Sequence, residues 1–211
     1  MVKENSQAMR PCLFAVHGNS RQMRRKRIET IAELEPIIGF LASVFDFEWM
    51  VRRAILALSA SPTAVIKVWF RSKHGLDDYK EAWVQFVDKP PQGIPFLLRN
   101  YDKSKHVEWS VLKDAFEQRH PLVHGINGFL EDDVAKFNIQ LFLTASEIME
   151  SILQANGKSA FKTIPVRRAK TNDDDSARKT LAANRKISQK RHSRIAQRVN
   201  KAKNSKSHTI A

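Results

Sequence analysis

Hydrophobic residues recur at intervals of three and four through the middle of this chain, which is the spacing of one face of an amphipathic helix. The first such stretch runs from residue 28 to about residue 45, with a kink expected at Pro36 and a helix cap at Asp46. A second, long apolar segment covers residues 49–70, and Ser61-Pro62 predicts a break within it. The apolar positions of the first stretch are Ile31, Leu34, Ile38, Leu41 and Phe45.

Three further helices are predicted from the same spacing. A short one covers residues 76–87, and a loop rich in proline follows it. The next runs from about residue 107 to Gly125, a typical helix C-cap. The last begins after Gly128 and has the most regular apolar stripe: Val134, Phe137, Leu141, Ala145, Ile148 and Ile152. No alternating strand pattern competes, so the predicted class is all-α, a helical bundle of four or five helices.

The formal charge of +14 is concentrated at the two ends of the chain. Residues 1–27 contain 7 Lys and Arg against 1 acid, residues 28–157 contain 13 against 18, and residues 158–211 contain 16 against 3. The middle has the size of one domain with one core. The ends have the low apolar content and single-sign charge of segments that do not fold alone. We therefore predict a helical domain at 28–157, a basic N-terminal arm at 1–27 and a basic, largely disordered tail at 158–211.

Cys12 is the only cysteine, which excludes an internal disulfide and a cysteine-based zinc site and fits a reducing cytosol. No apolar run has the length of a signal-peptide core or a membrane span. The sequence therefore predicts a cytoplasmic protein that needs no membrane and no cofactor. The basic cluster at 24–27 also fits a nuclear import signal, although such clusters more often contact nucleic acid.

The segment 119–125, Arg-His-Pro-Leu-Val-His-Gly, combines a permanent cation with two imidazoles. Arginine can hold a phosphate through two parallel hydrogen bonds, and histidine titrates near neutral pH and can therefore move a proton. Arg119 also continues the apolar stripe of its helix. This position distinguishes the segment from the chance pairs Arg10/His17, Arg99/His106 and Arg185/His192, and the stripe consists of Trp109, Leu112, Phe116, Arg119 and Val123.

An arginine on a core-facing stripe needs a partner, a cleft or a second subunit, because an isolated buried cation is costly. One alternative is therefore purely structural, with Arg119 paired to an acid such as Glu48 or Glu81 inside the bundle. A metal site is a further alternative, since His120 and His124 share a helix face. Two imidazoles are too few, and no nearby third ligand with a recognised spacing is apparent apart from acids such as Glu117, which argues against it.

Pro121 lies inside the predicted motif helix. It has no N–H to donate, so the carbonyl of Glu117 loses its helical partner and the helix is expected to bend at the motif.

The motif and its helical setting resemble the HEPN superfamily, whose signature is an arginine, a polar residue, a few further residues and a histidine. The pattern Trp109-x-x-Leu112 followed by Arg119-His120-x-Leu122-Val123-His124 is most similar to the RiboL-PSP branch. The resemblance covers roughly residues 28–157 and neither end. It implies a homodimer that brings two motifs together at a cleft, and a metal-independent endoribonuclease, commonly a toxin or an antiviral effector.

The resemblance also implies roles for the three residues. Arg119 would bind and polarise the scissile phosphate, His124 would act as general acid and base, and His120 would orient the substrate. The products would be a 2′,3′-cyclic phosphate and a 5′-hydroxyl. Some family toxins have a tyrosine two residues after the histidine, which an antitoxin modifies. This chain has Ile126 there, so that mode of control is not expected, while an antitoxin or effector-complex partner stays open.

The basic ends predict RNA binding, because each neutralised phosphate releases counterions. A solubilising extension is the alternative for the tail. Two function classes therefore stay open: an RNA-cutting enzyme of HEPN type, and a catalytically silent helical module that binds nucleic acid or a protein partner through its basic arms. The residues expected to contact RNA are Arg24, Arg25, Lys26, Arg27, Arg167, Arg168, Arg185, Lys186, Lys190, Arg191, Arg194 and Arg198.

Overall fold

The computed structural model describes residues 20–71, 73, 75–88, 90–125 and 129–168. These residues form helices and no β-strand, which confirms the predicted all-α class. None of the described helices has both the length and the apolar character needed to cross a membrane. The helices are α1 (Arg21–Leu34), α2 (Pro36–Leu58), α3 (Thr63–Phe70), α4 (Leu76–Phe86), α5 (Ile94–Asn100), α6 (Trp109–Glu117), α7 (Arg119–His124) and α8 (Asp132–Ala155).

The chain divides into two structural units. The first consists of residues 1–60 and 69–165, and it contains the candidate motif. The second consists of residues 61–68 and 166–211, so most of it lies beyond the described residues. The predicted break at Ser61-Pro62 is confirmed, since α2 ends at Leu58 and α3 begins at Thr63.

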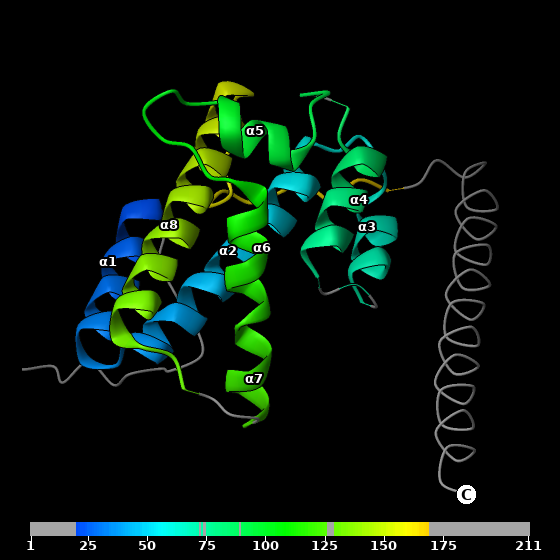
Figure 1. Cartoon of the computed structure of the whole chain (residues 1–211). Helices are drawn as coiled ribbons and strands as arrows, with labels where there is room; N and C mark the ends of the chain where they lie inside the picture. Colours follow the sequence, from blue (N-terminus) through cyan, green and yellow to red (C-terminus); the bar gives the residue numbers. More distant parts are fainter. Residues whose placement is uncertain (1–19, 72, 74, 89, 126–128, 169–211) are drawn as a thin grey trace, which may run out of the picture. The chain divides into compact units, whose positions relative to one another are not determined.

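The core of the first unit lies between α2 and α8, with α1 packed beside them (Figure 1). The ring centre of Phe142 on α8 is 6.1 Å from that of Phe40 and 5.8 Å from that of Phe47, both on α2. All three rings are fully buried. Burial of one such side chain stabilises a fold by about 1.5–3 kcal/mol, so this cluster is a major source of the stability of the bundle.

Pro36 separates two helices rather than kinking one. It lies in the first turn of α2, where its missing N–H removes no helical hydrogen bond, while α1 ends at Leu34. The two helices then approach so closely that a Cβ atom at Gly39 would lie 2.6 Å from the Cβ of Ala32. The corner between α1 and α2 therefore requires glycine at position 39.

Asp46 is not a helix cap, which corrects the sequence-based prediction. It lies inside α2, is fully buried and forms ion pairs with Arg21 and Arg24 of α1. The guanidinium carbon of Arg24 also lies 4.0 Å from the centre of the Trp49 ring. Because these arginines are packed into the bundle, the folded unit begins before residue 28, the predicted end of the N-terminal arm.

The folded unit also extends past the predicted boundary at Gly157. The side chain of Arg53 on α2 donates to the carbonyl of Ala160 at 2.8 Å, and the backbone N–H of Ala160 donates to the Glu150 carboxylate at 3.4 Å. Ala160 is fully buried between these partners. Residues 158–165 therefore belong to the helical unit and not to the tail.

The prediction that the whole apolar stripe of α8 is buried holds for only half of the helix. Its second half is confirmed, since Ala145, Ile148 and Ile152 are in the core. In its first half the predicted positions are not buried, and the buried residues are Ala135, Asn138, Ile139 and Phe142. The position of α2 selects this face, and Phe137 is consequently left 60% exposed.

Candidate functional site

The motif lies on α7, which follows α6 after an interruption at Gln118. Pro121 has no N–H to donate to the carbonyl of Glu117, the last residue of α6, and the bend at the motif stays a prediction. The side chain of Gln118 accepts a hydrogen bond from Asn138 of α8 at 2.8 Å. At the other end, Gly125 has a φ of 66° and its N–H donates to the Pro121 carbonyl. Both ends of this short helix are therefore held in place.

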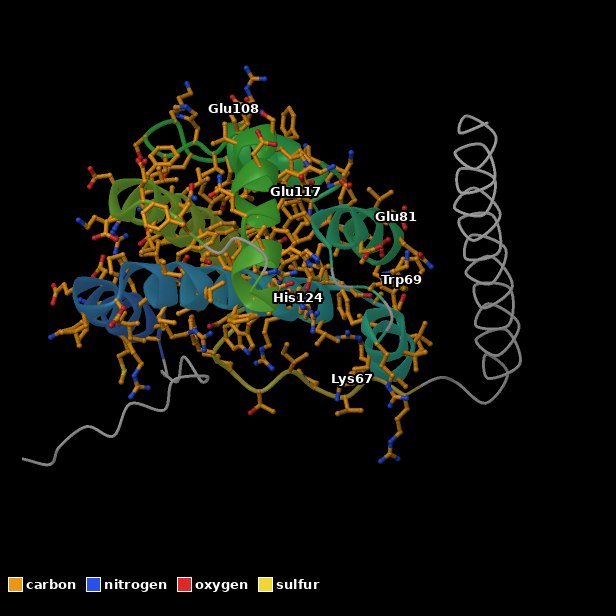
Figure 2. The ribbon with its side chains drawn as sticks, turned by 60° about the horizontal axis from the view of Figure 1, so that its bottom comes forward. Lys67, Trp69, Glu81, Glu108, Glu117 and His124 are labelled. Atoms are coloured by element: carbon orange, nitrogen blue, oxygen red, sulfur yellow. The ribbon has the colours of Figure 1, made fainter. Side chains whose placement is uncertain are left out.

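Arg119 forms an ion pair inside the unit. Its Nη1 donates to Oε2 of Glu48 on α2 at 3.0 Å, and its guanidinium carbon lies 4.1 Å from the centre of the Phe116 ring. Glu48 is buried, whereas the Arg119 side chain is 22% exposed. Glu81, the other acid considered, is on α4 (Figure 2), and it pairs with Lys73 at 3.4 Å. Of the two acids that the sequence offers as partners of Arg119, Glu48 is the one that pairs with it.

A tyrosine connects this ion pair to a second arginine. The Tyr79 hydroxyl on α4 donates to Oε1 of Glu48 at 2.9 Å and accepts from Nε and Nη2 of Arg52 at 3.0 and 2.8 Å. Burial raises the pKa of Tyr79, and the charge of Glu48 raises it further. The hydroxyl therefore stays protonated and continues to donate. Both carboxylate oxygens of Glu48 are engaged, which makes it a rigid anchor for Arg119.

The two histidines of the motif are exposed and contact each other. The ring centres of His120 and His124 are 4.4 Å apart, with an angle of 53° between the ring planes. Figure 2 shows His124 near the end of the α6–α7 stretch, beyond Glu117. The structure thus joins the two imidazoles in one contact, while the Arg119 guanidinium contacts Glu48 and Phe116 instead. Exposed imidazoles can exchange protons with a bound substrate.

One of the predicted RNA contacts at the N-terminal end needs correction. Arg24 is only 7% exposed and serves as a core ion-pair partner, so its charge is not offered to a surface phosphate. Arg25 pairs with Glu147 of α8. Lys26 is exposed and Arg27 is partly exposed on α1. Of the four basic residues in this cluster, Lys26 is the one that is exposed.

The predicted contacts in the tail lie mostly outside the described residues. Within the second unit, Nε of Arg167 donates to the carbonyl of Ser61 at 2.9 Å, and the backbone N–H of Thr63 donates to the carbonyl of Arg167 at 3.1 Å. Arg168 is exposed. The predicted contacts that lie outside the described residues are Arg185, Lys186, Lys190, Arg191, Arg194 and Arg198.

Sequence reasoning missed Tyr79 and Arg52 as parts of the site. Tyr79 belongs to a helix that the apolar spacing predicts well, but no local pattern indicates that its hydroxyl meets a carboxylate 31 positions earlier. Only the packing of α4 against α2 brings them together.

The chain has no significant match among protein-family models, curated proteins or solved structures. Its function is therefore inferred from the residues of α7 and their contacts.

Proposed function

We propose that this protein is a metal-independent endoribonuclease of HEPN type that cuts RNA by attack of a ribose 2′-hydroxyl on the adjacent phosphate. The observation that supports this best is the exposed pair His120 and His124 on the same short helix as Arg119, whose guanidinium is anchored by buried Glu48. Such a reaction needs a proton acceptor, a proton donor and a cation for the phosphate, and it needs no metal-bound water.

Each motif residue has a role in this chemistry. An imidazole of His124 takes the proton of the 2′-hydroxyl, whose oxygen then bonds to phosphorus, and a protonated imidazole returns a proton to the departing 5′-oxygen. Arg119 forms one hydrogen bond to Glu48, from Nη1. Its other N–H groups bind and polarise the phosphate. His120 orients the substrate. The products are a 2′,3′-cyclic phosphate and a 5′-hydroxyl.

A homodimer would supply both histidine roles at once, with one His124 as base and the partner's His124 as acid. Exposed apolar residues on the elements around the motif support a second copy as the occupant, since large exposed apolar side chains are typical of interfaces. A cytoplasmic toxin or antiviral effector, controlled by an antitoxin or effector-complex partner, is the biological role that we propose. The exposed apolar residues on these elements include Phe45 on α2, Val111 on α6, Val123 on α7, Phe129 between α7 and α8, and Phe137 on α8.

A second candidate is a catalytically silent helical module that binds RNA or a protein through its basic ends. The ion pair between Arg119 and Glu48 favours it, because a purely structural arginine would have just such a buried partner. In that case the salt-dependent affinity would come from the tail, and α7 would serve to hold the bundle together.

Product analysis separates the two candidates. Full-length protein is incubated with an end-labelled RNA in excess EDTA, and the new ends are identified by their reactivity with a cyclic phosphodiesterase and with polynucleotide kinase. An RNA-cutting HEPN enzyme is expected to leave cyclic phosphates and 5′-hydroxyls in EDTA. Intact RNA that remains bound to the protein would support the silent module, and cleavage that stops in EDTA would contradict the proposed mechanism.

A further inference from the structure

The geometry of the two motif histidines suits a metal ion as well as proton transfer. His120 and His124 lie one helical turn apart on the same face, and their ring centres are 4.4 Å apart. Two imidazoles bound about 2.1 Å from one ion, at the right angle of square-planar or tetragonal coordination, would have ring centres about 4.6 Å apart. The observed separation is therefore close to that of two neighbouring positions around a single metal ion.

The backbone that presents the pair is already fixed. The N–H of Gly125 donates to the carbonyl of Pro121, and this hydrogen bond closes the last turn of α7, which carries His124. Arg119 ties the start of the same helix to Glu48. Both imidazoles are exposed, so a dissolved ion can reach both rings.

We propose that His120 and His124 together form a binding site for a divalent transition-metal ion such as Ni²⁺, Cu²⁺ or Zn²⁺. Imidazole nitrogen prefers these ions, whereas Mg²⁺ prefers oxygen ligands. Within the described residues no third His, Cys, Asp or Glu completes the group, so water fills the other positions and the ion stays exchangeable. Such an exchangeable ion differs from the fully ligated, resident metal site against which the lack of a third ligand in the sequence argues.

Metal binding has a consequence for the proposed chemistry, and this consequence alone rests on the proposed function. A bound ion occupies the nitrogen lone pairs that accept protons, so Ni²⁺ or Zn²⁺ inhibits cleavage and EDTA restores it.

Calorimetry with NiCl₂ tests the site on the full-length chain at neutral pH. The variants are His120→Ala and His124→Ala, each of which removes one ligand from an exposed position, and the matched control is His106→Ala, another exposed histidine. We expect one wild-type site that each motif variant weakens by roughly 10²-fold, the usual gain from joining two ligands on one scaffold. The control should bind like the wild type, affinity should rise from Co²⁺ to Ni²⁺ to Cu²⁺, and MgCl₂ should give no signal.

The outcomes that overturn the proposal are distinct from failure of the proposed function. Wild-type protein without a Ni²⁺ site, or motif variants that bind Ni²⁺ as tightly as the control, would refute the metal site whether or not RNA is cut. Cleavage that persists at saturating Ni²⁺ would contradict the inhibition and leave the site standing. Absence of cleavage without any metal would count against the endoribonuclease, while the calorimetry would still decide the metal site.

Discussion

Replacement of Glu48 by glutamine tests the anchor of the motif. The substitution keeps the size of the side chain and one oxygen acceptor, but it removes the charge that compensates Arg119. Loss of one partner costs about 3–5 kcal/mol for a fully buried ion pair. The Arg119 side chain is 22% exposed, and water can solvate part of its charge. We therefore expect a smaller loss in the free energy of unfolding, about 2 kcal/mol, similar to one hydrogen bond between charged groups.

Urea unfolding followed by circular dichroism measures this loss, and the chain offers a matched control. Glu108 pairs with Arg99 at 3.1 Å, and both side chains are largely exposed, so Glu108→Gln should cost at most about 0.5 kcal/mol. Tyr79→Phe removes the hydroxyl that fixes Glu48 and should cost about 1 kcal/mol. In the cleavage assay, Glu48→Gln should lower kcat about tenfold, because Arg119 loses its position.

A double-mutant cycle isolates the pair itself. Glu48→Gln, Arg119→Gln and the double variant should give a coupling energy of about 1–2 kcal/mol, the range for residues in one ion-pair network. If Glu48→Gln is no more destabilising than the Glu108 control, or if the coupling is zero within error, the ion pair does not anchor α7 and the reasoning fails.

Three further predictions concern the bundle and its tail. A chain that ends after Gly157 should unfold at a temperature several degrees lower than one that ends after Pro165, because only the shorter chain loses residues bonded to the core; equal midpoints in calorimetric scans would contradict the revised boundary. The chain that ends after Pro165 should bind RNA more weakly and with a flatter salt dependence than the full chain, and an unchanged slope in filter binding would assign the tail another task. Partial burial raises the pKa of Glu147, but hydrogen bonds from Arg25 and Lys105 outweigh it and leave the pKa below its ordinary value. The stability that Glu147 adds, at most about 1 kcal/mol, is thus present above about pH 4.3 and lost as the pH falls through the lower folded pKa, so Glu147→Gln should match the wild type in acid but not at pH 7.

The helical class and several boundaries could be predicted because they depend on local chemistry. Pro62 removes a backbone donor in the middle of a long apolar segment and favours a break there, and Gly125 tolerates the left-handed conformation that ends α7. The face that each helix buries depends on its neighbours. Phe137 continues a regular stripe in the sequence, yet α2 covers the adjacent face of α8 and leaves it exposed. Asp46 resembles a cap by sequence and becomes a core acid only because Arg21 of α1 meets it.

The candidate site was predictable to the extent that it follows from the cost of burying charge. A core-facing Arg119 requires an anion, and Glu48 was one of two acids that the sequence offered. The contribution of Tyr79 could not be foreseen, because its hydroxyl is useful only where α4 crosses the buried carboxylate. Proton transfer by His120 and His124 depends on the position of a bound substrate, which neither the sequence nor the fold contains.

Cleavage by a single histidine variant tests the proposed function most directly. Full-length wild type, His124→Ala and the control His106→Ala are compared on a mixed-sequence RNA in EDTA, with circular dichroism to verify that each protein is folded. We expect His124→Ala to cut 10²–10⁴-fold more slowly, the usual contribution of a positioned acid and base, which is about the effect expected for Arg119→Ala. His120→Ala should cost less, and the control should match the wild type. Wild-type cleavage by a folded His124→Ala protein would contradict the assignment of α7 as the catalytic centre.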